Sequence, residues 1–165
     1  MLNMFKPTIM KKFFMMMVCL MMAIGSYAQR DHTEIPKDVL PKNVITFVDK
    51  FYPNGFQTDA RYFVEHEYMN MPSSPIDEFE VHFRNGTILE FNRRGNLTSI
   101  ECGWGDYINI DILPSNIKSQ IIGFNKKIIE LNIDYDRRGQ NARKYEIEFE
   151  NGFECNYNNK GKVIH

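Results

Sequence analysis

The sequence lacks every short motif that by itself predicts catalysis. It contains no Gly-x-Ser-x-Gly, no His-Glu-x-x-His and no glycine-rich phosphate loop. The four histidines are scattered, and only His82 shares a predicted strand face with a nearby carboxylate, that of Glu80. An enzyme is therefore not expected, and no catalytic residue, metal ligand or cofactor is predicted.

Runs of basic residues are also missing, and no basic stripe alternates with aromatic residues. This pattern argues against a nucleic-acid partner. An Asp-x-Asp-x-Asp-Gly calcium loop is absent as well. Calcium stays an alternative ligand only because carboxylates are abundant.

Long apolar runs are limited to the first 28 residues. Lys6, Lys11 and Lys12 precede an uncharged apolar run from 13 to 24, and Ser26-Tyr27-Ala28 follows it. This is the three-part pattern of a cleaved signal peptide, and the run is shorter than the roughly 20 residues of a membrane span. Residues 1–28 are predicted to direct export to the periplasm or the outside, with no membrane span after their removal. A retained N-terminal anchor is the alternative.

The exported part, from 29 to 165, carries 17 basic and 21 acidic residues, a formal net charge of −4. It keeps two cysteines, Cys102 and Cys155. An oxidising compartment permits a disulfide between them. Two inert thiols are the alternative, because Cys155 falls at an inward position of a predicted strand, where a small thiol packs well.

An internal repeat organises the exported part. Leu40-Pro41-Lys42-Asn43-Val44 recurs as Leu113-Pro114-Ser115-Asn116-Ile117, and the hairpin at 79–86 recurs at 145–152 with its Asn-Gly turn. After a flexible start at 29–34, the sequence predicts two tandem units, 35–105 and 106–165.

Each unit is predicted to begin with a helix after its Leu-Pro motif. Val44, Phe47, Val48 and Phe51 form the apolar side of the first helix, and Ile117, Ile121, Ile122 and Phe124 that of the second. Strands with a period of two follow in both units. The predicted fold class is α+β, a tandem duplication of a helix packed on a four-stranded antiparallel β-meander.

The paired Leu-Pro helix starts and the duplicated hairpins at 79–91 and 145–157 resemble the PepSY-like family, also described as β-lactamase-inhibitor-like. The resemblance covers nearly all of the exported part. It implies a binding role in place of a catalytic one. Inhibition of a β-lactamase stays an analogy of fold, because no inhibitory loop can be matched residue by residue.

Carboxylates crowd the outward face of the second unit. Those singled out as candidates for binding a partner are Glu130, Asp134, Asp136, Glu146, Glu148, Glu150 and Glu154. Like charges on paired strands are unfavourable, so such a face fits a basic partner or a divalent cation. A solvated face kept acidic for solubility is the plain alternative.

Gly103-Trp104-Gly105-Asp106-Tyr107 joins the two units and holds the only tryptophan. Trp104 and Tyr107 are predicted either to anchor a partner or to pack between the units. The loop Met69 to Pro75 is a further exposed apolar candidate. The sequence thus predicts an exported, non-enzymatic protein that binds another exported protein, with a cation or small-ligand sensor as the alternative.

Overall fold

A computed structural model describes residues 32–53, 60–66 and 76–164 of the chain. The predicted signal peptide and the loop Met69 to Pro75 lie outside the described residues. The strands are β1 (Thr33–Glu34), β2 (Arg61–His66), β3 (Ile76–His82), β4 (Ile88–Asn92), β5 (Leu97–Glu101), β6 (Ile128–Tyr135), β7 (Ala142–Phe149) and β8 (Glu154–Asn158). The helices are α2 (Lys42–Phe51) and α3 (Ser115–Ile121), with 3₁₀ turns at Lys37–Val39, Ile110–Ile112 and Ile122–Phe124.

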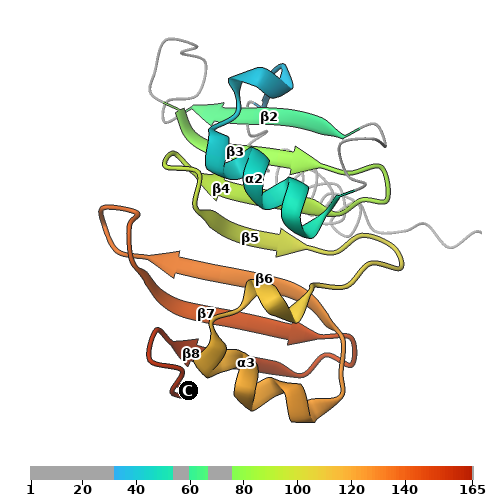
Figure 1. Ribbon diagram of the computed structural model, residues 1–165, viewed down its shortest axis with the longest axis vertical. Coiled ribbons are helices and arrows are strands. Elements are labelled where there is room, and N and C mark those ends of the chain that lie inside the picture. Colours follow the sequence, from blue (N-terminus) through green and yellow to red (C-terminus); the bar gives the residue numbers. More distant parts are fainter. Residues whose placement is uncertain (1–31, 54–59, 67–75, 165) are drawn as a thin grey trace, which may run out of the picture. The chain divides into compact units, whose positions relative to one another are not determined.

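All eight strands form one antiparallel sheet in the order of the sequence, β1 to β8 (Figure 1). The prediction of two helix-on-four-strand units, each with its own meander, is therefore wrong. Strand β5 pairs directly with β6, Ile100 opposite Leu131, and both of these side chains are fully buried. This pairing satisfies backbone groups that two separate sheets would leave as open edges.

The structure also has less helix than predicted, and its second half has one strand fewer. Helix α2 has 10 residues but α3 only 7. In the predicted second unit, the described residues contain the three strands β6 to β8, and beyond them only an isolated bridge between Tyr157 and Val163. The chain thus folds as a mainly antiparallel β structure.

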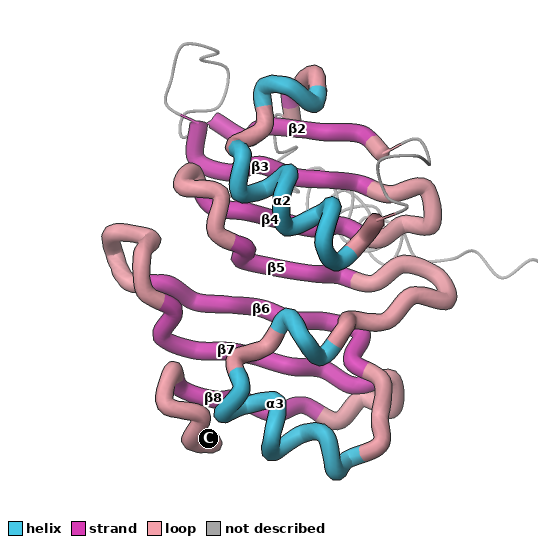
Figure 2. Tube along the Cα trace, in the orientation of Figure 1, coloured by secondary structure: helices cyan, strands magenta, loops and turns pink. Residues whose placement is uncertain are grey.

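Both helices lie over one face of the sheet (Figure 2). Val44 and Val48 of α2, with Ile117 and Ile121 of α3, are buried in one core cluster with the inward side chains of the strands. The predicted apolar side of the second helix is only half right. Ile122 is 63% exposed and Phe124 is 39% exposed, because the helix ends in a 3₁₀ turn that carries them away from the core.

The two Leu-Pro motifs make matching contacts with two strand-connecting turns. The Asn43 side-chain amide donates hydrogen bonds to the carbonyls of Arg94 (2.9 Å) and Gly95 (2.7 Å), and Asn116 donates to that of Asn159 (3.3 Å). Gly95 has a φ of +71° and packs against Asn43, so a side chain there would be strained and would collide. These contacts hold the start of each helix against the sheet.

Irregular pairing breaks the period of two in two central strands. Leu97 and Ile100 of β5 are both buried although they are three residues apart, and so are Ile128 and Leu131 of β6. The register shifts at these points of the sheet. A bulge of this kind places two successive side chains on the same face, which here sends Thr98 and Ser99 to the face without helices.

The N-terminal segment is attached to the sheet in place of the predicted flexible start. Strand β1 pairs with β2, and the Arg61 guanidinium donates two hydrogen bonds to Glu34, of 3.1 and 2.7 Å. His32 Nδ1 lies 2.8 Å from Glu80 Oε1, although without the alignment of a hydrogen bond. Residues 32–34 therefore belong to the folded unit.

We expect the single sheet to unfold as one cooperative unit. Leu131→Ala should lower the free energy of unfolding by about 2–5 kcal/mol, since it empties space at the β5–β6 pairing. Urea unfolding followed by circular dichroism measures this effect. Ile122→Ala is the control, because this isoleucine is 63% exposed and its loss should cost about 0.5 kcal/mol or less. A plateau between two separate transitions would contradict a single sheet.

Candidate functional site

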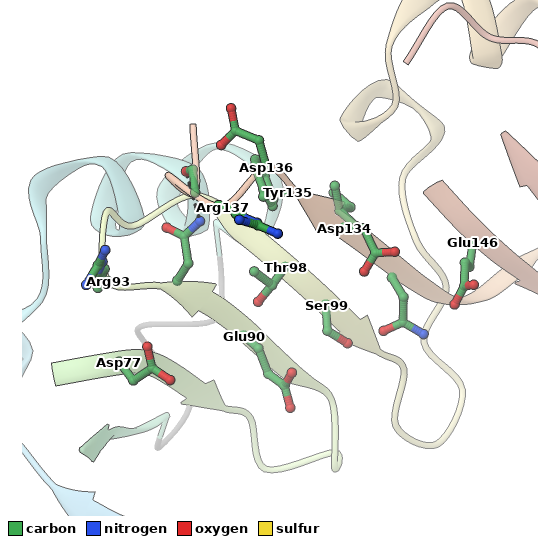
Figure 3. A pocket seen from close by; sticks show the side chains of 14 residues that line it. Asp77, Glu90, Arg93, Thr98, Ser99, Asp134, Tyr135, Asp136, Arg137 and Glu146 are labelled. Carbon is green, nitrogen blue, oxygen red and sulfur yellow. Dashed lines mark hydrogen bonds between the residues drawn. The ribbon is translucent and has the colours of Figure 1, made fainter. Parts of the chain in front are cut away.

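The face of the sheet opposite the helices carries a polar groove where β4, β5 and β6 meet. The groove encloses about 700 Å³, within the range of ligand sites. Figure 3 shows Glu90, Thr98 and Ser99 on one side of it and Asp134 and Glu146 on the other. Its lining residues are Asp77, Glu90, Asn92, Arg93, Thr98, Ser99, Asn132, Ile133, Asp134, Tyr135, Asp136, Arg137, Gly139 and Glu146.

Strand pairing places the polar side chains of this groove. Ser99 lies opposite Asn132, and Asn132 lies opposite Glu146, so these three form a row across β5, β6 and β7. Glu90 extends the row on β4, opposite Ser99. The amides and hydroxyls both donate and accept hydrogen bonds, while the carboxylates only accept.

Negative charge dominates the groove. Five of its lining residues are acidic and two, Arg93 and Arg137, are basic. Lys144 adds a cation beside the groove and contacts the Glu146 carboxylate. The excess of carboxylates favours a cationic group in the groove, while the two arginines provide donors for an acceptor on the same ligand.

Tyr135 supplies the aromatic surface of the groove. Burial, and secondarily the neighbouring Tyr145, raise the pKa of its phenol to about 12. The hydroxyl is therefore protonated at any physiological pH and can donate a hydrogen bond.

Asp136 is a turn residue more than a ligand. Its carboxylate accepts hydrogen bonds from the backbone of Gln140 (2.9 Å) and Arg138 (3.1 Å) and from the Asn141 side chain (2.8 Å). The bond from Gln140 is the largest cause that lowers the pKa of Asp136 to about 2, and the bond from the Asn141 side chain is the next. These hydrogen bonds use the Asp136 carboxylate to hold the turn after β6.

A second acidic feature lies on the same face. Glu101, Glu130, Glu148 and Glu154 stand opposite one another on β5 to β8, and we call these four side chains the carboxylate row. Three of them line a small cavity of about 140 Å³ together with Asn156. The Asn156 Oδ1 atom is buried and accepts no hydrogen bond. Among the described residues, however, no three His, Cys, Asp or Glu side chains are arranged to hold a metal ion.

The remaining predicted site residues lie elsewhere. Glu150 occupies the turn after β7, and Tyr107 is 39% exposed in the segment after β5. Trp104 is 97% exposed, so it does not pack between two units, which was one of its two predicted roles.

The loop of Trp104 is nevertheless firmly held. Its backbone N–H donates to the carbonyl of Asn85 at 3.0 Å, and the Gly103 N–H donates to the buried Thr87 hydroxyl at 2.9 Å. Thr87 in turn donates to Asp106 at 2.8 Å. A side chain at Gly103 would collide with the Asn85 carbonyl, which explains the glycine at this position. The loop thus presents an exposed indole on a fixed backbone.

The side chains of Glu80 and His82 are in contact, as expected from their shared strand face. Nε2 of His82 lies 2.6 Å from Oε2 of Glu80. Glu80 is only 2% exposed, because His82 and His32 contact its carboxylate and Phe63 lies opposite it on β2. The pair therefore attaches the N-terminal segment to the sheet.

Sequence reasoning missed the uncharged part of the groove. Asn92, Thr98, Ser99 and Asn132 were not singled out, and neither were Arg93 and Arg137. Strict alternation counted from the buried Ile100 would place Thr98 on the helix-covered face. Because the bulge reverses this, the sequence pattern does not show that Thr98 lines the groove. Arg93 lies in the turn between β4 and β5, and Arg137 lies in the turn between β6 and β7. Both line the same groove only because β5 pairs with β6.

The structure leaves both cysteines free, so of the two alternatives the disulfide between Cys102 and Cys155 is not formed. Cys155 lies opposite Ile147 and packs against the core, as predicted. Burial, and next the nearby Asp106, raise the pKa of the Cys102 thiol to about 12. A thiol held protonated in this way is a poor nucleophile.

The described residues thus form a single antiparallel sheet with helices over one face and a polar groove on the other. The family model "Putative beta-lactamase-inhibitor-like, PepSY-like" matches residues 25–70 and 77–165. The chain therefore belongs to the PepSY-like family, which confirms the resemblance found in the sequence. A comparison with curated proteins gave no match.

Solved structures share the fold. A putative periplasmic protein of the DUF2874 family from Bacteroides vulgatus has a TM-score of 0.67 and 22% identity, over 84% of this chain and 98% of that one. A putative calcium-regulated periplasmic protein from Bacteroides thetaiotaomicron has a TM-score of 0.65 and 19% identity, over 82% and 95%. A third, a putative periplasmic protein of unknown function from Bacteroides vulgatus, has a TM-score of 0.62 and 19% identity, over 81% and 97%.

These neighbours are described as periplasmic, in agreement with the predicted export. Throughout the part of the chain that the structure describes, no helix has the length and apolar character needed to cross a membrane.

Asp136 should make stability depend on pH in the acid range. Its folded-state pKa of about 2 lies below the ordinary value of about 3.9, so its contribution is complete above about pH 4 and is lost as the pH falls toward 2. Thermal unfolding from pH 5 to pH 2 should show a smaller pH-dependent loss in Asp136→Asn than in the wild type. Asp134→Asn makes the same change of charge outside the turn, and an equal effect there would contradict this assignment.

Proposed function

We propose that this chain is an exported, non-enzymatic binding protein whose polar groove holds a basic segment of another exported protein. The observation that carries the proposal is the charge of the groove, five carboxylates against two arginines, on a face that neither α2 nor α3, the two α-helices of the described residues, covers. The family description and the periplasmic neighbours support export and a binding role.

Electrostatic repulsion between paired glutamates on this face supports a binding role. Glu80 lies opposite Glu90, Glu130 opposite Glu148, and Glu148 opposite Glu154. Like charges directly opposite on paired strands destabilise a sheet by a few tenths of a kcal/mol or more. Glu90 is the one member of these pairs that lines the groove, and a cation bound there offsets its repulsion. The remaining carboxylates of this face contribute an acidic field that steers a basic partner toward it.

The groove favours a side chain such as Lys or Arg on an extended segment. Asp134 and Glu146 accept hydrogen bonds from the cation, while Asn132, Thr98 and Ser99 can pair with the backbone of the segment. Arg93 and Arg137 at the groove suit an acceptor beside the cation, which restricts binding to mixed-charge segments.

Capture from an envelope extract tests this proposal. The exported protein is immobilised beside the variant Asp134→Asn/Glu146→Gln, and bound proteins are identified and titrated. The partner should bind the variant about tenfold or more weakly, because charge-assisted hydrogen bonds contribute about 1.5–3 kcal/mol each. Its binding to the wild type should weaken as salt rises.

The control variant is Asp38→Asn/Asp49→Asn, which removes the same charge from exposed positions on the helix side. It should retain the partner at wild-type affinity. If the partner binds both variants equally, or if its affinity does not change with salt concentration, the polar groove is not the site.

A divalent cation is a second candidate ligand, supported by one observation. Asn156 Oδ1 is buried without a hydrogen bond next to three carboxylates of the carboxylate row, and such oxygens are the ligands that Ca²⁺ prefers. One neighbour is described as calcium-regulated. Because no ready metal geometry exists among the described residues, these side chains would have to converge on the ion.

Thermal unfolding with and without millimolar calcium tests this candidate. Binding to the native state at 100 times Kd stabilises by about 2.7 kcal/mol. Calcium should raise the unfolding temperature of the wild type and of Asp38→Asn/Asp49→Asn, but not that of Glu148→Gln/Glu154→Gln. An equal rise in all three, or none in any, would rule out the carboxylate row.

A further inference from the structure

A second groove of opposite chemistry lies near the start of β6 and shares no lining residue with the polar groove. It encloses about 410 Å³. Its lining includes the buried side chains of Ile108, Ile128 and Phe149 and the more exposed ones of Ile110 and Ile122. Such apolar walls with a few polar groups at the rim are typical of sites for small ligands.

Two adjacent lysines stand at the rim. Lys127 Nζ lies 3.8 Å from the centroid of the Tyr107 ring, and Lys126 Nζ lies 5.1 Å from that of Phe153. A hydrogen bond with Tyr107 is the largest cause that raises the pKa of Lys127. Cation–π contacts of this kind hold ammonium groups in place while leaving donors for an anion.

Backbone hydrogen bonds fix the frame of the groove. The Ile108 N–H donates to the Ile128 carbonyl at 2.9 Å, and the Glu150 N–H donates to the Lys127 carbonyl at 3.0 Å. Three segments far apart in the sequence are thereby joined around one cavity. The groove is preformed, so a ligand need not organise it.

Exposed apolar side chains continue the groove outward. Ile122 is 63% exposed, Phe153 46% and Phe124 39%. Exposed apolar side chains that lie together mark binding sites, whereas single ones scattered over a surface do not. One acidic side chain, Glu150, also lines the groove, which leaves it with one net positive charge.

We propose that this groove binds an aliphatic carboxylate, with the head group at Lys126 and Lys127 and the chain along Ile110 and Ile122. The lysines supply the charge complementarity and the isoleucines the apolar contact. The site is separate from the acidic groove and does not depend on the proposed function. Glu150 opposes the head group and limits the affinity.

Titration with dodecanoate below its micellar concentration, followed by calorimetry on protein purified from the periplasm, tests the site. Acetate, which has the head group without the chain, should not bind detectably. Lys126→Gln/Lys127→Gln and Ile122→Asn should each weaken dodecanoate binding about tenfold. Glu150→Gln should strengthen it, because the repelling carboxylate is gone.

The matched control is Lys160→Gln/Lys162→Gln, which removes two exposed lysines at the Gly161 turn, outside the groove. It should bind dodecanoate as the wild type does. All of these positions are exposed, and circular dichroism should show unchanged folding. Failure of dodecanoate to bind, equal loss in both lysine variants, or acetate binding as tight as dodecanoate binding would overturn the proposal.

Discussion

The pairing of β5 with β6 is the constraint on which the rest of the structure depends. It rests on three residue pairs, of which Ile100–Leu131 is fully buried, and it joins strands β1–β5 to strands β6–β8. The polar groove spans this seam, with Thr98 and Ser99 on one side and Asp134 on the other (Figure 3). Without the pairing there would be two edges and no groove, so the same hydrogen bonds that close the sheet also assemble the site.

The two described α-helices lie over one face of the sheet, and the polar groove and the carboxylate row lie on the other. Both helices pack their buried valines and isoleucines on one face, and the face left open carries the carboxylates. The open face includes repulsive pairs, which a sheet selected for stability alone would avoid. Such local conflict is typical of a surface kept for binding.

The two proposed surfaces differ in chemistry and in construction. The acidic groove lies across strands, and its specificity depends on cross-strand register. The apolar groove is framed by connecting segments around Tyr107, Lys127 and Glu150, whose backbones are bonded to one another. A protein segment and an aliphatic anion could therefore occupy the same molecule together, because neither surface shares a lining residue with the other.

Local interactions were readable from the sequence. The Leu-Pro helix starts, the Asn-Gly turns and the alternating strands follow from proline geometry, glycine φ and the period of two, and so did the family. Only the tertiary structure decided that β5 joins β6, that a bulge turns Thr98 outward, that Glu80 is buried, and that Ile122 and Phe124 are exposed. These outcomes depend on contacts between residues far apart in the chain. No local pattern encodes them, because edge pairing is chosen by the free energy of the whole sheet.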